Sequence, residues 1–162
     1  AVVMFDLYGT TTSLYGLNAE VMHYVGYVTL LIAAFSVLRL AKFNIDDSQT
    51  TEFCGLPTPA NALMLLSLAM LCQNGELAIY QEQIAIIAVA SSLLLISPIR
   101  MFALKFKGFG FKENRLRYLF LLLSVAIIIC EPTYSILLII VLYIVVSTLR
   151  WLFAKESVTE KK

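Results

Sequence analysis

The chain has 162 residues, of which 60% are hydrophobic and 14% are charged, and its mean hydropathy is +0.85. This composition excludes an ordinary soluble domain and predicts an integral membrane protein. With a formal net charge of +1, we expect no nucleic-acid partner.

Five apolar segments approach the length that crosses a bilayer, for which a helix needs about 20 residues. In chain order they are residues 21–41, 59–73, 84–104, 116–131 and 134–153, and residues 1–9 add an apolar segment too short to cross. Residues 136–146 are apolar on every side, unlike the alternating strands of a barrel. We therefore predict an all-α, polytopic bundle of five transmembrane helices, forming a single membrane domain over residues 1–162.

The positive charges indicate how these helices are oriented. All twelve Lys and Arg residues fall at Arg39 and Lys42, in residues 100–117, or in residues 150–162, which are alternate connections of the five segments. The intervening connections carry carboxylates and no Lys or Arg. Because cytoplasmic loops are enriched in Lys and Arg, we expect the basic loops and the C-terminus to be cytoplasmic.

Residues that commonly bind metals or act as nucleophiles are sparse. Cys54, Cys72 and Cys130 have no CxxC spacing, and His23 is the single histidine. We expect neither a disulfide nor a zinc site from this pattern.

Polar residues gather instead at the cytoplasmic edge of the first expected span. Arg39 and Lys42 are three residues apart, so they share a helix face, and Asn44 follows one turn later. After a short acidic loop, Thr58 suits a helix N-cap and Pro59 the first helical position, which would leave backbone N–H groups free near Asn61. Such a helix start attracts carboxylate or phosphate.

We therefore take Arg39, Lys42, Asn44, Thr58 and Asn61 as candidate substrate-binding residues, converging on one anion. The alternative is that Arg39 and Lys42 only extend to the membrane surface and fix the topology, and that Thr58 is an ordinary cap.

The sequence Leu38-Arg39-Leu40-Ala41-Lys42-Phe43-Asn44, followed by Phe53-Cys54-Gly55-Leu56-Pro57-Thr58-Pro59-Ala60, carries a family resemblance. It resembles the bacterial and archaeal phosphatidylserine synthases of the CDP-alcohol phosphatidyltransferase family, in which these strings typically read RLARFN and F-x-GLP-[ST]-P-A. Lys42 stands where the family more often has arginine, which keeps the charge but loses the planar fork for bidentate contact.

The resemblance implies a role in phospholipid biosynthesis: transfer of a phosphatidyl group from CDP-diacylglycerol to L-serine, with release of CMP. The family signature, D-x2-D-G-x2-A-R-x8-G-x3-D-x3-D, implies carboxylate ligands for a divalent metal, Mg or Mn, and a base for the attacking hydroxyl. No stretch of residues 1–162 matches this signature. We therefore assign no catalytic residue and no metal ligand here, and we expect residues 1–9 to be the end of a truncated catalytic helix and this chain alone to be inactive.

Further expectations follow from the resemblance. The implied partners are CDP-diacylglycerol, L-serine, membrane lipid and, because family members are often dimers, a second copy of the chain; the implied location is a bacterial inner membrane. Three alternatives stay open: a related enzyme with another acceptor, such as glycerol phosphate or inositol phosphate, a transporter or channel fragment, and a non-catalytic membrane scaffold.

Overall fold

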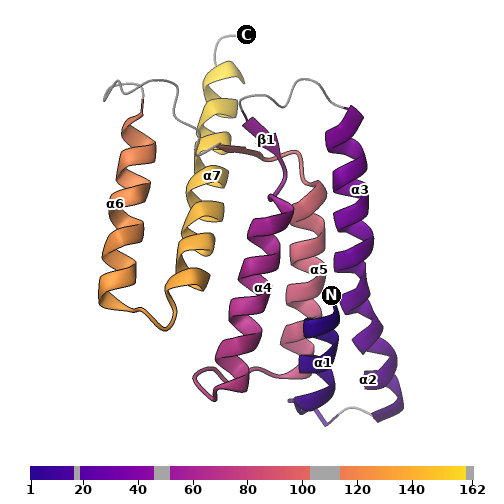
Figure 1. Ribbon diagram of the computed structural model, residues 1–162. Coiled ribbons are helices and arrows are strands. Elements are labelled where there is room, and N and C mark those ends of the chain that lie inside the picture. Colours follow the sequence, from indigo (N-terminus) through magenta and orange to yellow (C-terminus); the bar gives the residue numbers. More distant parts are fainter. Residues whose placement is uncertain (17–18, 46–51, 103–113, 160–162) are drawn as a thin grey trace.

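The computed structural model describes residues 1–16, 19–45, 52–102 and 114–159 of the chain. The described part is mostly helical (Figure 1). Its elements are α1 (Val2–Thr10), α2 (Ala19–Gly26), the 3-10 helix η1 (Tyr27–Leu30), α3 (Leu31–Ile45), β1 (Glu52–Cys54), α4 (Thr58–Gln73), α5 (Gln81–Ile96), β2 (Arg100–Phe102), α6 (Arg115–Cys130) and α7 (Ser135–Thr159).

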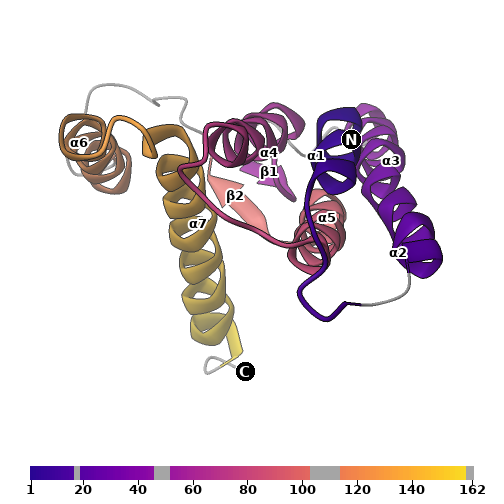
Figure 2. The same cartoon turned by 90° about the horizontal axis from the view of Figure 1, so that it is seen from below.

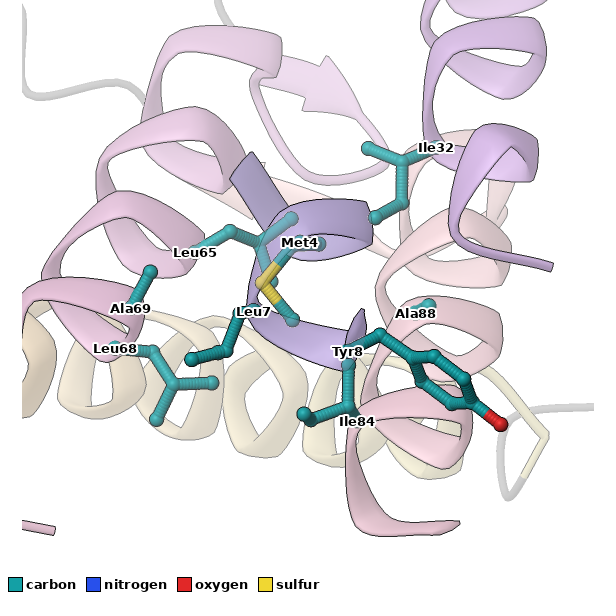
Figure 3. Packing of buried hydrophobic residues seen from close by; sticks show 9 residues of the cluster. All are labelled: Met4, Leu7, Tyr8, Ile32, Leu65, Leu68, Ala69, Ile84 and Ala88. Atoms are coloured by element: carbon teal, nitrogen blue, oxygen red, sulfur yellow. The ribbon is translucent and has the colours of Figure 1, made fainter. Parts of the chain in front are cut away.

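The short helix α1 packs against η1, α4 and α5 at one side of the bundle (Figure 2). Figure 3 shows the apolar cluster around it, whose buried members are Met4, Leu7, Tyr8, Ile32, Leu65, Leu68, Ala69, Ile84 and Ala88. These side chains come from four helices that are far apart in the sequence. Burial of their apolar surface, worth about 25 cal/mol per Å² in water, and close packing hold α1 to its neighbours.

A second apolar cluster joins the other end of the bundle to α6 and α7. Its buried members are Leu56, Met101, Phe120 and Tyr143. The rings of Phe120 and Tyr143 meet edge to face, with centroids 6.0 Å apart. Helix α7 also packs on α4 and β2, whereas α6 contacts the rest of the bundle mainly through α7 (Figure 2).

The prediction of a third span over residues 84–104 is wrong for its second half. Helix α5 ends at Ile96, and residues 100–102 form β2, which pairs antiparallel with β1. The reason is Pro98: it disfavours the helical conformation at the preceding Ser97, which is extended with ψ of 150°. The all-α prediction therefore misses a small two-stranded ribbon.

Gly55 and Leu56 fasten this ribbon to the end of α5. The Gly55 N–H donates to the Ile99 carbonyl and the Leu56 N–H donates to the Leu94 carbonyl, each at 2.9 Å. Gly55 has φ of +75°, and a Cβ atom built there would lie 2.3 Å from the Leu95 oxygen. Only glycine fits this conformation and this close approach. The docked segment fixes where α4 begins.

Two helical segments of the described part are long and apolar enough to cross a membrane, His23–Ile45 and Ser135–Phe153. Only 17% of the residues in the most apolar part of each segment are buried within the chain. Most of both surfaces therefore suits contact with lipid, which supports membrane association. Helices α4 and α5 are apolar but have 16 residues each, or about 24 Å of helix. Five spans therefore stay a prediction.

The basic and acidic ends of the helices lie at opposite ends of the bundle. The last turns of α3 and α7, the first turns of α4 and α6 and both strands lie at one end, at the top of Figure 1. The α1–α2, α4–α5 and α6–α7 connections lie at the other end. This arrangement agrees with the alternation of charge in the sequence. Which end faces the cytosol stays a prediction.

At the acidic end, Glu82 ties the segment after α1 to the start of α5. Its carboxylate accepts hydrogen bonds from the Ser13 hydroxyl and from the N–H groups of Leu14 and Tyr15, the latter two at 3.1 and 3.4 Å. These bonds, the Ser13 hydroxyl first, lower the pKa of Glu82 to about 2. The carboxylate is therefore charged at neutral pH and holds this connection in place.

We predict that Gly55→Ala destabilises the protein more than Gly75→Ala. Both glycines have φ of +75°, but a Cβ at Gly75 meets nothing within 4 Å, so it carries only the conformational cost of about 1–2 kcal/mol. At Gly55 the overlap with the Leu95 oxygen adds roughly 1–3 kcal/mol. Chemical unfolding in detergent micelles, followed by circular dichroism, measures both; equal losses would contradict the docking of Gly55 on α5.

We also predict acid sensitivity at the Glu82 connection. Because folding lowers the pKa of Glu82 from 4.5 to about 2, its contribution to stability is fully present above pH 4.5 and is lost as the pH falls toward 2. The protection factors of the Leu14 and Tyr15 amides, which compare their exchange with that of an unfolded chain at the same pH, should therefore fall across that interval. Glu82→Gln should remove the pH dependence, and an unchanged profile in that variant would refute the assignment.

Candidate functional site

Arg39 is buried in the described part of the bundle, at the end that carries the basic residues. Its side chain is 8% exposed, and its Nη1 donates to the Thr58 hydroxyl at 3.2 Å. Its Nε has no hydrogen-bond partner among the described residues. A buried guanidinium with an unpaired donor is costly unless an anion or acceptor completes it. Arg39 is therefore packed inside the chain, and a role beyond fixing the topology stays a prediction.

Thr58 does not have the expected capping role. Helix α4 begins at Thr58, its N-cap is Pro57, and no side chain caps it. The Thr58 hydroxyl instead accepts the hydrogen bond from Arg39. Sequence alone missed this because the docked Gly55–Leu56 segment, and not local capping, decides where the helix starts.

Asn61 lies one turn into α4, on the same face as Thr58. Its side chain is 1% exposed, and its Oδ1 has no partner within the described residues. The expectation of a free backbone N–H at Asn61 is wrong, since this group donates to the Pro57 carbonyl at 3.0 Å. The polar atom that Asn61 leaves unpaired is therefore on its side chain.

Thr58 and Asn61 form part of the wall of a cavity of about 330 Å³ between α1, α3 and α4. Ser36 also lines it, one turn before Arg39 on α3, but its hydroxyl donates to the Ile32 carbonyl of its own helix. The remaining lining residues are apolar: Ala1, Val3, Met4, Ile32, Ala33, Ala62, Leu65 and Leu66. This volume suits a small molecule or part of a lipid, with its polar group toward Thr58 and Asn61.

Helix α7 contributes two polar residues that the sequence analysis passed over. Tyr143 is 8% exposed and lies close enough to Arg39 for an electrostatic interaction, and Ser147 is fully buried one turn later. Their spacing of four residues in an otherwise aliphatic helix was the available signal. The structure thus brings Thr58 of α4 and Tyr143 of α7 near Arg39.

Lys42 and Asn44 are not part of this buried group. Both side chains are exposed in the last turns of α3. The structure therefore brings together Arg39, Thr58 and Asn61, whereas Lys42 and Asn44 lie on the neighbouring surface. The acidic loop after Asn44 and most of the basic connection before α6 fall outside the described residues.

The family resemblance predicts a divalent metal whose ligands lie outside this chain. Among residues 1–16, 19–45, 52–102 and 114–159, no three His, Cys, Asp or Glu side chains group together. This part of the chain therefore does not fit a divalent-metal site, and the residues gathered here suit binding of an anion.

Two curated enzymes of Helicobacter pylori are similar to this chain, and both are named CDP-diacylglycerol–serine O-phosphatidyltransferase. The enzyme of strain ATCC 700392 / 26695 is 24% identical over 150 residues, and that of strain J99 is 25% identical over 151 residues. Each match covers 86% of this chain and 62% of the enzyme. No family model matches the chain. These matches support a distant relationship, with the chain spanning less than two thirds of its curated relatives.

We predict that Thr58→Val lowers stability by about 1–3 kcal/mol, because it leaves the buried Arg39 guanidinium with one acceptor fewer while keeping the shape of the side chain. The matched control is Thr148→Val, whose hydroxyl donates only to the Ile144 carbonyl of its own helix and should cost less. Thermal unfolding in one detergent measures both. Equal stabilities of the two variants would contradict the Arg39–Thr58 bond.

Proposed function

We propose that this chain belongs to an enzyme of phospholipid biosynthesis that transfers a phosphatidyl group from CDP-diacylglycerol to L-serine, forming phosphatidylserine and CMP. Two observations support the proposal. The distant relatives, whose matches cover 86% of this chain, are named for this activity. The two sequence strings that resemble the family also meet in space, because Arg39 of the first donates to Thr58 of the second.

The observation that carries the proposal is the buried Arg39 guanidinium with its unpaired Nε. In surroundings of low polarity, a fixed positive charge attracts an anion far more strongly than it does in water. A carboxylate or phosphate oxygen at Nε would complete its hydrogen bonds. The role of Arg39 in this proposal is to hold the serine carboxylate or a lipid phosphate beside the start of α4.

The other expected residues take surrounding roles in the proposal. Lys42 and Asn44, exposed at the end of α3, attract the soluble acceptor or a lipid headgroup from the membrane surface. Divalent metal, Mg or Mn, would neutralise the pyrophosphate of the lipid donor, through ligands that lie outside the described residues. We further propose a bacterial inner membrane as the location, with the basic end of the bundle cytoplasmic, and a homodimer as the assembly.

The direct test is serine-dependent release of CMP from CDP-diacylglycerol by the full gene product that contains these residues, purified in detergent. Release with glycerol phosphate or inositol phosphate in place of serine would assign another acceptor. No release with any of them would favour a membrane scaffold or a transporter fragment.

In the same assay we predict that Arg39→Ala lowers kcat/KM for serine by at least about 10-fold, as expected for loss of a charge-assisted hydrogen bond. Arg150→Ala removes an equal charge from an exposed position on α7 and should change the value less than about 3-fold. Equal small effects would return Arg39 to a role in topology.

A further inference from the structure

Three buried side-chain atoms of the described residues are unpaired, Arg39 Nε, Asn61 Oδ1 and Ser147 Oγ, and the first two are of opposite kind. Arg39 Nε can only donate a hydrogen bond, and Asn61 Oδ1 can only accept one. Neither has a partner in the described part of the chain, although both side chains are more than nine-tenths buried. Buried polar groups are nearly always hydrogen-bonded, so each unpaired atom indicates a missing group.

The two atoms are connected through Thr58. Arg39 donates to the Thr58 hydroxyl, and Thr58 precedes Asn61 by three residues on α4, which places their side chains on one face about 5–6 Å apart. Thr58 and Asn61 both line the cavity of about 330 Å³. One small ligand in the cavity would therefore meet an acceptor at Asn61 and the hydroxyl of Thr58. The positively charged Arg39, which is not itself a lining residue, lies behind Thr58 and donates to that hydroxyl.

We infer that Asn61 recognises the amino group of the substrate that receives the phosphatidyl group, so that Arg39 and Asn61 together select a zwitterionic α-amino acid. This inference rests on the proposed function and assigns the residue that separates serine from hydroxyl compounds lacking an amine. The serine ammonium donates to Asn61 Oδ1, while its carboxylate accepts from Arg39 and from the Thr58 hydroxyl. The amino and carboxyl groups of an α-amino acid share one carbon atom, which suits two recognition points one helical turn apart.

The unpaired atoms as the structure places them favour this orientation over the reverse one. A carboxylate placed at Asn61 Oδ1 would meet a second acceptor, and an ammonium placed at Arg39 would meet a like charge. An acceptor that carries a phosphate but no amine could satisfy Arg39 but would leave Asn61 Oδ1 buried and unpaired. A site built around a buried hydrogen bond rejects analogues that lack the partner group.

The test compares L-serine with 3-hydroxypropionate, which has the hydroxyl and the carboxylate but no amine, as acceptors for the full gene product. With the wild-type protein, kcat/KM measured by CMP release should be at least about 100-fold higher for serine. Asn61→Leu should lower the value for serine by about 10- to 100-fold and leave the value for 3-hydroxypropionate within about 3-fold. The preference for the amine should therefore collapse in this variant.

A matched control lies on the same helix. Ser67→Ala removes a hydroxyl that donates to the Met64 carbonyl of α4 itself and should leave both acceptors and their ratio unchanged. An equal loss for both acceptors in Asn61→Leu would mean that Asn61 only supports the fold, and would overturn the inference while leaving the proposed function standing.

The wild-type comparison can overturn the inference even where Asn61→Leu does not fold. A wild-type protein that uses 3-hydroxypropionate within about 3-fold of serine would overturn amine recognition. A wild-type protein that releases no CMP with serine would overturn the proposed function, and this inference with it. These outcomes differ in which acceptor and which variant fail, so the two failures are distinguishable.

Discussion

The structure depends on the docking of Gly55 and Leu56 onto the end of α5. Their two N–H groups donate hydrogen bonds to the Ile99 and Leu94 carbonyls, and the Leu56 side chain is fully buried. This contact joins the end of α5 to the β1–β2 ribbon and sets the first turn of α4 at one height in the bundle. Moving that turn would carry Thr58 away from Arg39 and Asn61 away from the cavity.

A buried arginine in an apolar bundle needs compensation, and the chain supplies only part of it. Thr58 accepts one hydrogen bond and Tyr143 lies nearby, but Nε stays unpaired among the described residues. Replacing such a group by a hydrophobic side chain is often neutral or stabilising, so a buried charge is weak evidence for stability. Its presence beside a cavity with a second unpaired atom is better explained by ligand binding.

The weak sequence match and the geometry are consistent with each other. At 24–25% identity, a match over most of this chain supports distant kinship and does not define a substrate. The structure adds that residues from two separate strings, 19 positions apart, meet at a hydrogen bond. It also brings Tyr143 from a third segment near Arg39, a contact that no local pattern in the sequence indicates.

The sequence by itself determined the membrane class, the helical segments and the alternation of charge, because hydropathy and helix-breaking residues act locally. It also picked out Arg39, Thr58 and Asn61, through residue type and spacing. Tertiary structure decided how those residues are arranged. Thr58, which we expected to cap a helix, accepts a hydrogen bond from Arg39. The unpaired group of Asn61 is its side-chain Oδ1 and not its backbone N–H, and the side chain of Lys42 lies on the surface. After Ile96, where Pro98 ends the helix, the third expected span continues as a strand that pairs with residues 52–54, and the N–H groups of Gly55 and Leu56 donate to the Ile99 and Leu94 carbonyls beside it. These outcomes depend on contacts between distant segments, which periodicity along one helix does not contain.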